Sequence, residues 1–255
     1  MHEYRSLDAA KIVETAQALS QRIDERFPGS GLSKVAQELL SVTRESASVS
    51  RSLGRPNVWI RLLAGLAILF LAGAFVAGLV TAYLIKGDGP LFEKLSDMLQ
   101  GLEAAINEVV LTGVAIFFLL SLESRWKRSR ALTKIHVLRS LAHIIDMHQL
   151  TKDPYRVAQP EAGADTPSSP ERLLSPFELA RYLDYCSESL AVISKVGALY
   201  VQNFHDAVTL SAVNDLEDLV SGLSRKIWQK IMMLDRTVAP PNTEPPPRSE
   251  GAAPV

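Results

Sequence analysis

Two uninterrupted apolar stretches dominate the hydropathy pattern of this chain. The first, residues 62–85 (LLAGLAILFLAGAFVAGLVTAYLI), contains 24 residues without a charge. As an α-helix it is about 36 Å long, which crosses a hydrocarbon core of about 30 Å with some tilt. No cleavage motif follows this stretch, so we expect a transmembrane helix rather than a secretory signal.

The second stretch is shorter. Residues 109–122 (VVLTGVAIFFLLSL) contain 14 uncharged residues, and a helix of about 21 Å also occurs in protein cores and re-entrant segments. Extension back to residue 104 reaches spanning length but includes Asn107 and Glu108. A chain that has crossed the membrane once returns most simply through a second span. We therefore expect spans at about 62–85 and 104–122, within a transmembrane hairpin over residues 58–124.

Basic residues in the flanks predict the orientation of this hairpin. The loop 86–103 has two lysines, Lys86 and Lys94, whereas the outer flanks are richer in cations. The flanking cations are Arg44, Arg51, Arg55 and Arg61 before the first span and Arg125, Lys127, Arg128, Arg130 and Lys134 after the second. By the positive-inside rule both termini are cytoplasmic, with Trp59 and Trp126 at the inner interface and Tyr83 at the outer one. A multi-pass protein of a bacterial inner membrane is therefore expected.

The remaining segments show helical spacing and no strand alternation, so the predicted fold is all-α, a membrane hairpin with a cytoplasmic helical bundle of coiled-coil type. We expect cytoplasmic N-terminal helices in residues 1–57, an amphipathic helix on the outer surface within loop 86–103, and a cytoplasmic extension of the second span over 125–150. A flexible Pro-rich linker (151–175), a helical hairpin (176–236) and a disordered Pro-rich tail (237–255) follow.

Apolar residues that recur every three or four positions mark the predicted buried faces. Residues 7–27 and 32–53 each carry one such stripe, and 131–145 form a seam of the coiled-coil type. Ser175-Pro176-Phe177-Glu178 is a capping box with proline at the first helical position. The two faces that follow are Leu179, Leu183, Cys186, Leu190, Ile193, Gly197, Tyr200 and Phe204, then Val213, Leu216, Val220, Leu223, Ile227, Ile231 and Leu234. They predict an antiparallel helical hairpin.

Composition limits the function classes. The 255 residues carry 27 basic and 28 acidic side chains, a balance that argues against a nucleic-acid surface. The single cysteine, Cys186, excludes an internal disulfide and a cysteine-based zinc site, and its place on a seam predicts a buried structural thiol. No phosphate-binding, dinucleotide-binding or nucleophile motif is present. We therefore expect no enzyme and no cofactor.

One helical face in the cytoplasmic extension carries ligand-type side chains. His136, Arg139, His143 and Asp146 are spaced by three, four and three residues. This spacing fits a metal or phosphate site with His136, His143 and Asp146 as ligands, or an ordinary polar face. Zinc needs further ligands from elsewhere, and no such motif supplies them.

Two features lie within the spans. Glu108 is an intramembrane carboxylate that can form an acidic ring in an oligomeric channel; the alternatives are that it reaches the outer interface or is neutralised by protonation. Gly73-x-x-x-Ala77 and Ala74-x-x-x-Gly78 place small residues four apart, a spacing that lets helices pack closely within the hairpin or between copies. We expect the protein to self-associate or to bind a helical partner.

The basic run after the second span has two interpretations. Arg125, Lys127, Arg128 and Arg130 either bind anionic lipid head groups or serve only as the topology signal. Beyond this run, the segment LRSLAHIIDMHQLTKDP (residues 138–154) resembles part of a family of uncharacterised bacterial two-span membrane proteins, as does NDLEDLVSGLSRKIWQKIMML (214–234). The resemblance implies a bacterial source and no activity.

The leading hypothesis is a non-enzymatic membrane protein whose cytoplasmic helices form an interaction or scaffold module, with the seams of residues 179–204 and 213–234 packed on the post-span helix or on a partner. A small ion channel using Glu108 and a membrane-tethered metal or ligand sensor at His136, His143 and Asp146 are the alternatives.

Overall fold

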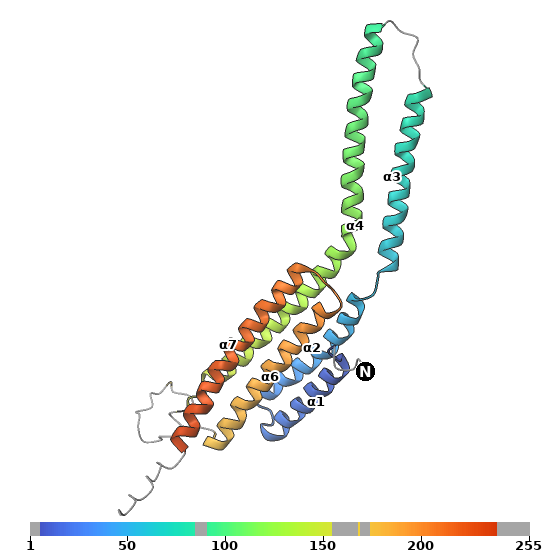
Figure 1. The fold of residues 1–255 in the computed structure, drawn as a ribbon. Helices are drawn as coiled ribbons and strands as arrows, with labels where there is room; N and C mark the ends of the chain where they lie inside the picture. Colours follow the sequence, from blue (N-terminus) through green and yellow to red (C-terminus); the bar gives the residue numbers. More distant parts are fainter. Residues whose placement is uncertain (1–5, 85–90, 155–167, 169–173, 239–255) are drawn as a thin grey trace, which may run out of the picture.

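Helices make up all the regular secondary structure of the described chain, as the sequence predicts. The computed structural model describes residues 6–84, 91–154, 168 and 174–238, with side chains for all of these except 79, 81–84, 91–98, 105, 237 and 238. The helices are α1 (Ala9–Arg26), α2 (Gly31–Leu53), α3 (Val58–Leu84), α4 (Leu91–Leu150), α6 (Pro176–Gln202) and α7 (Ala207–Val238). They form a bundle from which two helices project (Figure 1).

The helices begin at the residues that local capping chemistry favours. Asp8 and Ser30 cap α1 and α2 by accepting hydrogen bonds from backbone N–H groups two or three residues ahead. The predicted capping box at α6 is present, because Ser175 and Glu178 each accept a hydrogen bond from the other's backbone N–H. Between α1 and α2, Gly29 has a φ of 67°, a conformation that glycine adopts at no steric cost.

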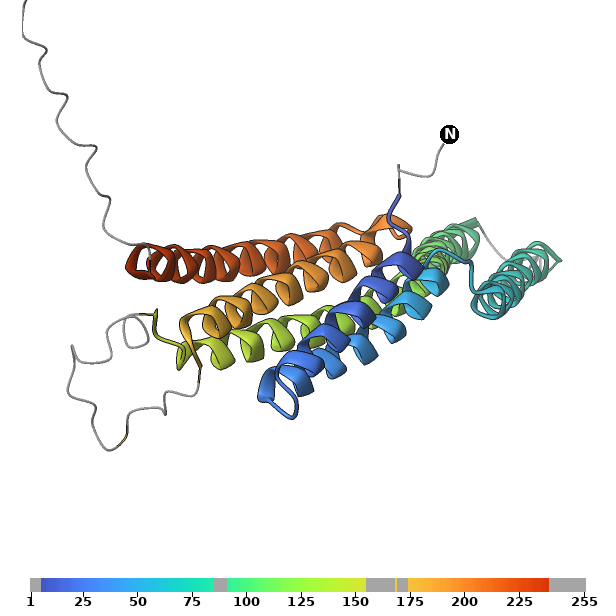
Figure 2. The ribbon, with the colours of Figure 1, turned by 90° about the horizontal axis from the view of Figure 1, so that it is seen from below.

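The bundle consists of α1, α2, residues 123–150 of α4, α6 and α7. Figures 1 and 2 show α1 beside α2 and α6 beside α7, with this part of α4 packed against α2, α6 and α7. The predicted apolar faces form its core, since Ile23, Leu138, Leu183, Leu190 and Ile227 are fully buried in one continuous cluster. The two seams predicted to meet the post-span helix or a partner are therefore covered within the chain itself.

The hairpin consists of α3 and residues 91–122 of α4. Both helices are long and apolar enough to cross a membrane, and their most apolar stretches are 6% and 0% buried, respectively. Partly or fully buried side chains recur every three or four residues on the facing sides of the two helices. Among these are Ala64, Ile68, Leu71 and Phe75 on α3, and Thr112, Ala115, Ile116 and Leu119 on α4. Most other apolar side chains that the structure describes in the hairpin are exposed.

The helix that includes the second apolar stretch begins before that stretch. The sequence predicts an amphipathic helix within residues 86–103 that leads into the second span, and α4 begins at Leu91 and continues without a break for 60 residues. No proline occurs between residues 91 and 150, so no residue of this segment lacks the backbone N–H that a continuous helix needs. The Tyr83 side chain, most of the predicted linker 151–175 and residues 239–255 of the tail lie outside what the structure describes.

Candidate functional site

Polar contacts concentrate where the hairpin joins the bundle. This junction, residues 54–61 and 123–130, is organised around Glu123, which follows the second apolar stretch directly. The Glu123 carboxylate accepts hydrogen bonds from the Asn57 backbone N–H at 2.9 Å and from Arg61 Nε at 2.7 Å. It also forms an ion pair with Lys127 Nζ at 2.9 Å, one helical turn further along α4. One carboxylate thus holds the first turn of α3 against α4.

These contacts keep Glu123 ionised. Burial of the side chain, which is 13% exposed, would by itself raise its pKa. The hydrogen bonds from Arg61, Asn57 and Lys127, together with the Lys127 charge, outweigh that effect and lower the pKa of Glu123 from 4.5 to about 2. At neutral pH the junction therefore contains a fixed negative charge with two cationic partners.

Two of the cations predicted to face lipid head groups are used inside the chain. Lys127 is buried, and its Nζ donates to the Arg55 backbone carbonyl at 2.8 Å as well as pairing with Glu123. Arg128 donates to both carboxylate oxygens of Asp206, at 2.6 to 3.1 Å, and Asp206 caps α7 through the Thr209 N–H. Both residues connect elements of the fold.

The pKa of the Asp206 carboxyl is lowered in the same way as that of Glu123. Burial would raise its pKa, but the hydrogen bonds and charge of Arg128, with two hydrogen bonds from Thr209, keep that pKa below 3.8. The loop between α6 and α7 is thereby attached to α4 at the end of the bundle that faces the hairpin.

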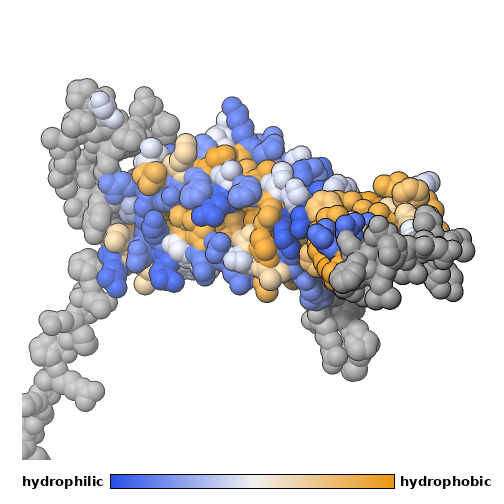
Figure 3. Space-filling view, turned by 90° about the horizontal axis from the view of Figure 1, so that it is seen from above, coloured by the Kyte–Doolittle hydropathy of each residue, from blue (hydrophilic) through white to orange (hydrophobic). Residues whose placement is uncertain are grey.

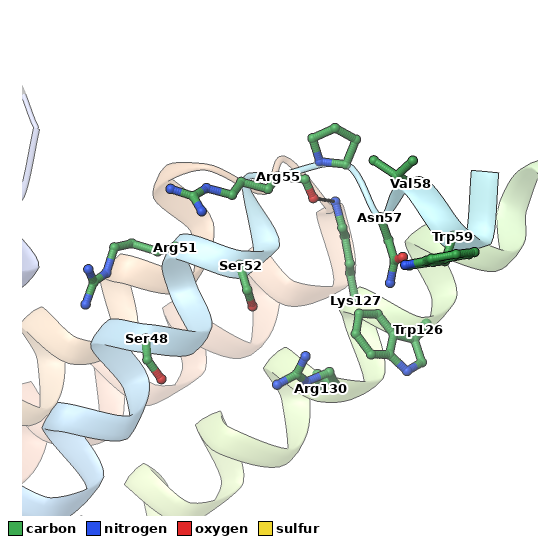
Figure 4. Close-up of a pocket in the computed structure, with 11 residues that line it drawn as sticks. Ser48, Arg51, Ser52, Arg55, Asn57, Val58, Trp59, Trp126, Lys127 and Arg130 are labelled. Atoms are coloured by element: carbon green, nitrogen blue, oxygen red, sulfur yellow. Dashed lines mark hydrogen bonds between the residues drawn. The ribbon is translucent and has the colours of Figure 1, made fainter. Parts of the chain in front are cut away.

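A groove opens beside this network. The junction groove has a volume of about 640 Å³, and residues of α2, the turn before α3, and α4 line it (Figure 4). Its lining is Ser48, Arg51, Ser52, Arg55, Pro56, Asn57, Val58, Trp59, Trp126, Lys127 and Arg130. No acidic side chain belongs to this set. The groove is consequently cationic on its bundle side and aromatic on its hairpin side.

The side chains around the groove are accessible. Trp59 is 80% exposed and Trp126 is 42% exposed, although indole rings of this size usually find cover in a protein interior. The Arg130 guanidinium stacks on Trp126, with its carbon 4.8 Å from the ring centroid. Arg125, in contrast, lies outside the groove and stacks on Phe118 of the hairpin.

The side chains of the predicted metal face do not come together into a site. His136 and His143 are exposed on α4, and Asp146 accepts a hydrogen bond from Gln149 at 2.6 Å. His148 is turned toward another element, where its ring packs over Gly31 at the start of α2. Within the described residues no three histidine, cysteine, aspartate or glutamate side chains are close enough to hold a metal ion.

The features predicted in the spans lie on the outer surface of the hairpin. Glu108 is exposed, and no hydrogen bond or ion pair joins it to another described residue. A Cβ added at Gly73 or Gly78 would meet nothing within 4 Å. These glycines therefore do not mediate packing between α3 and α4, and their role in contacts between copies stays a prediction.

Cys186 is fully buried in the bundle, where desolvation raises the pKa of its thiol to about 12, against small opposing effects of Lys230 and Lys152. A thiol of this kind is a weak nucleophile at neutral pH. This matches the predicted structural thiol.

Compared with known proteins, the chain matches no family model, no curated protein and no solved structure. The resemblance to bacterial two-span proteins stays a prediction, and functional argument rests on the geometry alone.

Sequence reasoning missed the main residues of the junction. It counted Arg51 and Arg55 only as orientation signals and gave Glu123 and Asp206 no role. A local signal existed for Glu123, because a carboxylate four residues before a lysine predicts an ion pair on one helix face. No local signal connects Glu123 to Asn57, 66 residues earlier.

Proposed function

We propose that this chain is a non-enzymatic integral membrane protein in which the hairpin anchors the helical bundle as an interaction scaffold. The bundle and both termini lie on the cytoplasmic side of a bacterial inner membrane, as the cationic flanks favour. The bundle surface then associates with a second copy of the chain.

The contrast between the two halves of the molecule supports this proposal. In the bundle, the apolar side chains of the predicted faces are largely buried in one core. In the hairpin, Leu63, Phe70, Leu111 and Phe117 are between 67% and 76% exposed. Figure 3 shows the same contrast, since polar residues cover much of the bundle while the described hairpin residues are mostly apolar. An exposed apolar surface of this length is stable in lipid and unfavourable in water.

The contacts at the junction fix the bundle relative to the hairpin, which favours a rigid anchor over a flexible tether. Because α4 is one continuous helix from the hairpin into the bundle core, and Glu123 fixes α3 to it, the bundle has a defined placement relative to the spans. Arg128 and Asp206 extend this connection to α7.

The outer face of α7 offers a surface for association. Trp228 and Met232, one turn apart, are 55% and 50% exposed. With Arg225, Gln229, Met233 and Arg236 they line a shallow, largely apolar groove of about 500 Å³ at the end of the bundle far from the hairpin. Exposed tryptophan, methionine and arginine are enriched at protein interfaces.

The test is the mass of the full chain after extraction. Membranes are washed with alkaline carbonate, the retained protein is solubilised in detergent, and its mass is measured by light scattering. We expect a multiple of 27.9 kDa for the wild type. The double variant Trp228→Ser and Met232→Ser should associate about 10- to 100-fold more weakly, as for interface anchors.

Leu210→Ser is the matched control, because Leu210 lies on the same helix at 48% exposure but outside the groove. It should leave the mass unchanged. A monomeric wild type, or a double variant that associates like the wild type, would contradict the scaffold proposal. The channel based on Glu108 and the sensor based on His136, His143 and Asp146 stay predictions without a structural observation that favours them.

A further inference from the structure

We infer that the junction groove binds the phosphate of an anionic phospholipid head group from the cytoplasmic leaflet. This inference rests on the proposed membrane insertion of the hairpin, and it assigns the groove a ligand class. The charge of the groove, its donors and its position along the molecule support this assignment.

The charge of the groove is not compensated within the described chain. Lys127 is paired with Glu123, but Arg51, Arg55 and Arg130 have no carboxylate of a described residue within ion-pair distance. Arg51 Nε donates only to the backbone carbonyl of Ala47. Three guanidinium groups around one hollow, with no acidic residue in its lining, favour a polyoxygen anion.

The three arginines of the lining come from two helices. Arg51 and Arg55 belong to α2 and its C-terminal turn, where their side chains extend along α2 and away from the two tryptophans, whereas Arg130 comes from α4 and lies beside Trp126 (Figure 4). The stacking of Arg130 on Trp126 orients its guanidinium while leaving its N–H groups available. Guanidinium groups held in this way form paired hydrogen bonds to phosphate oxygens.

The position of the groove indicates a lipid rather than a dissolved anion. Its hairpin-side wall includes Trp59 and Trp126, and the exposed apolar surface begins next to them with Leu62 and Leu63. Tryptophan is enriched at the level of lipid head groups, where its ring is at the apolar boundary and its N–H faces water. A phosphate in the groove therefore lies at head-group depth, with acyl chains along α3 and α4.

The test counts lipids bound to the detergent-purified full chain by native mass spectrometry. Phosphatidylglycerol is compared with phosphatidylcholine, and inorganic phosphate is added as a competitor. We expect retention of phosphatidylglycerol over phosphatidylcholine and no displacement by millimolar phosphate. The double variant Arg55→Gln and Arg130→Gln should weaken this retention about 10- to 30-fold, given the contribution of each basic residue near an anionic surface.

The matched control removes the same charge outside the groove. Arg125→Gln with Lys34→Gln, at an exposed cation of α2, leaves all three guanidinium groups in place and should change retention less than about twofold, as for dispersed surface charge. Thermal unfolding of both double variants shows whether the fold is kept. A second groove variant, Arg51→Lys, keeps the charge but loses the paired geometry, and we expect it to weaken retention as well.

Three results would overturn the inference: equal losses in both double variants, equal retention of the two lipids, or binding of inorganic phosphate that displaces the lipid. If the protein resists carbonate extraction and shows one of these results, the groove assignment alone fails. If the protein is recovered in the aqueous wash, the membrane proposal fails, and the lipid assignment fails with it.

Discussion

A single carboxylate holds together the place where the two halves of the molecule meet. Glu123 has three donors, Asn57 just before α3, Arg61 on α3 and Lys127 on α4, and Lys127 also donates to the Arg55 carbonyl. An acidic residue beside an apolar stretch is costly unless it is paired and hydrogen-bonded. The contacts of Glu123 meet that condition, which makes it a structural residue with a pH-dependent contribution.

The variant Glu123→Gln should lower the free energy of unfolding by about 1–3 kcal/mol at neutral pH, because it leaves Lys127 and Arg61 without their counter-charge. The folded pKa of about 2 is below the ordinary value of 4.5. The ionic contribution is therefore complete above pH 4.5 and is lost as the pH falls toward 2. Thermal unfolding of wild type and variant in detergent, followed by circular dichroism across this range, measures the difference.

Glu14→Gln is the control, since Glu14 is exposed on α1 and no hydrogen bond or ion pair joins it to another described residue. Its effect should be small at every pH. A Glu123→Gln difference that is as large at pH 2.5 as at pH 7 would refute the ionic explanation.

At the scale of elements, close approach between α6 and α7 depends on one glycine. A Cβ added at Gly197 would be 2.9 Å from Leu216 Cδ2, whereas one added at Gly222 of α7 would meet nothing within 4 Å. Both glycines lie inside helices, where glycine costs backbone entropy relative to alanine. Only Gly197 has a packing reason to be there.

Gly197→Val should destabilise the bundle by about 1–3 kcal/mol through overpacking against Leu216. Gly222→Ala should stabilise it by about 0.5–1 kcal/mol through helix propensity. Chemical unfolding of the purified protein measures both values. Similar effects of the same sign at the two positions would show that the α6–α7 contact is not as close as described.

The sequence predicted the helices and their buried faces well because both depend on local information. Steps of three and four residues identify the side of a helix that is buried, as Leu183, Leu190 and Leu138 show. Steps of this kind do not identify which helix covers that side. The sequence predicts that the seams of α6 and α7 form a helical hairpin packed on the post-span helix or on a partner, and in the structure α4 packs against both helices.

The junction was beyond local reasoning for the same physical reason. Glu123 and Asn57, or Arg128 and Asp206, are brought together only when the helices pack, 66 and 78 residues apart in sequence. Arg51, Arg55 and Arg130 look like ordinary flanking cations until α2 and α4 place them around one groove. His136, His143 and Asp146 lie on one helix at the predicted spacing, but within the described residues no three ligand-type side chains come close enough to hold a metal ion.

At the scale of the whole molecule, the two halves differ in where their apolar surface lies. The bundle buries most of its own, whereas the hairpin exposes apolar side chains along its outer surface. The junction between them carries the ionic contacts, the two exposed tryptophans and the cationic groove at one level. In the proposed function, lipid covers the hairpin, the junction orients the bundle against the membrane, and the outer face of α7 is available for association.

The most direct measurement of this central claim is aqueous labelling of single cysteines in sealed membrane vesicles. The native Cys186 is buried with a thiol pKa of about 12, so the background is low. Phe70→Cys in the hairpin and Phe177→Cys on α6 are matched sites, because these side chains are 76% and 65% exposed. A membrane-impermeant maleimide is the reagent.

Lipid should protect Phe70→Cys from the maleimide, although this position is exposed in the isolated chain. Phe177→Cys should react in inside-out vesicles and remain unlabelled in right-side-out vesicles. After the vesicles are dissolved in detergent and denaturant, both sites should label, above the Cys186 signal of the parent chain. Equal labelling of the two sites in inside-out vesicles would contradict a membrane-inserted hairpin, and labelling of Phe177→Cys only in right-side-out vesicles would reverse the proposed orientation.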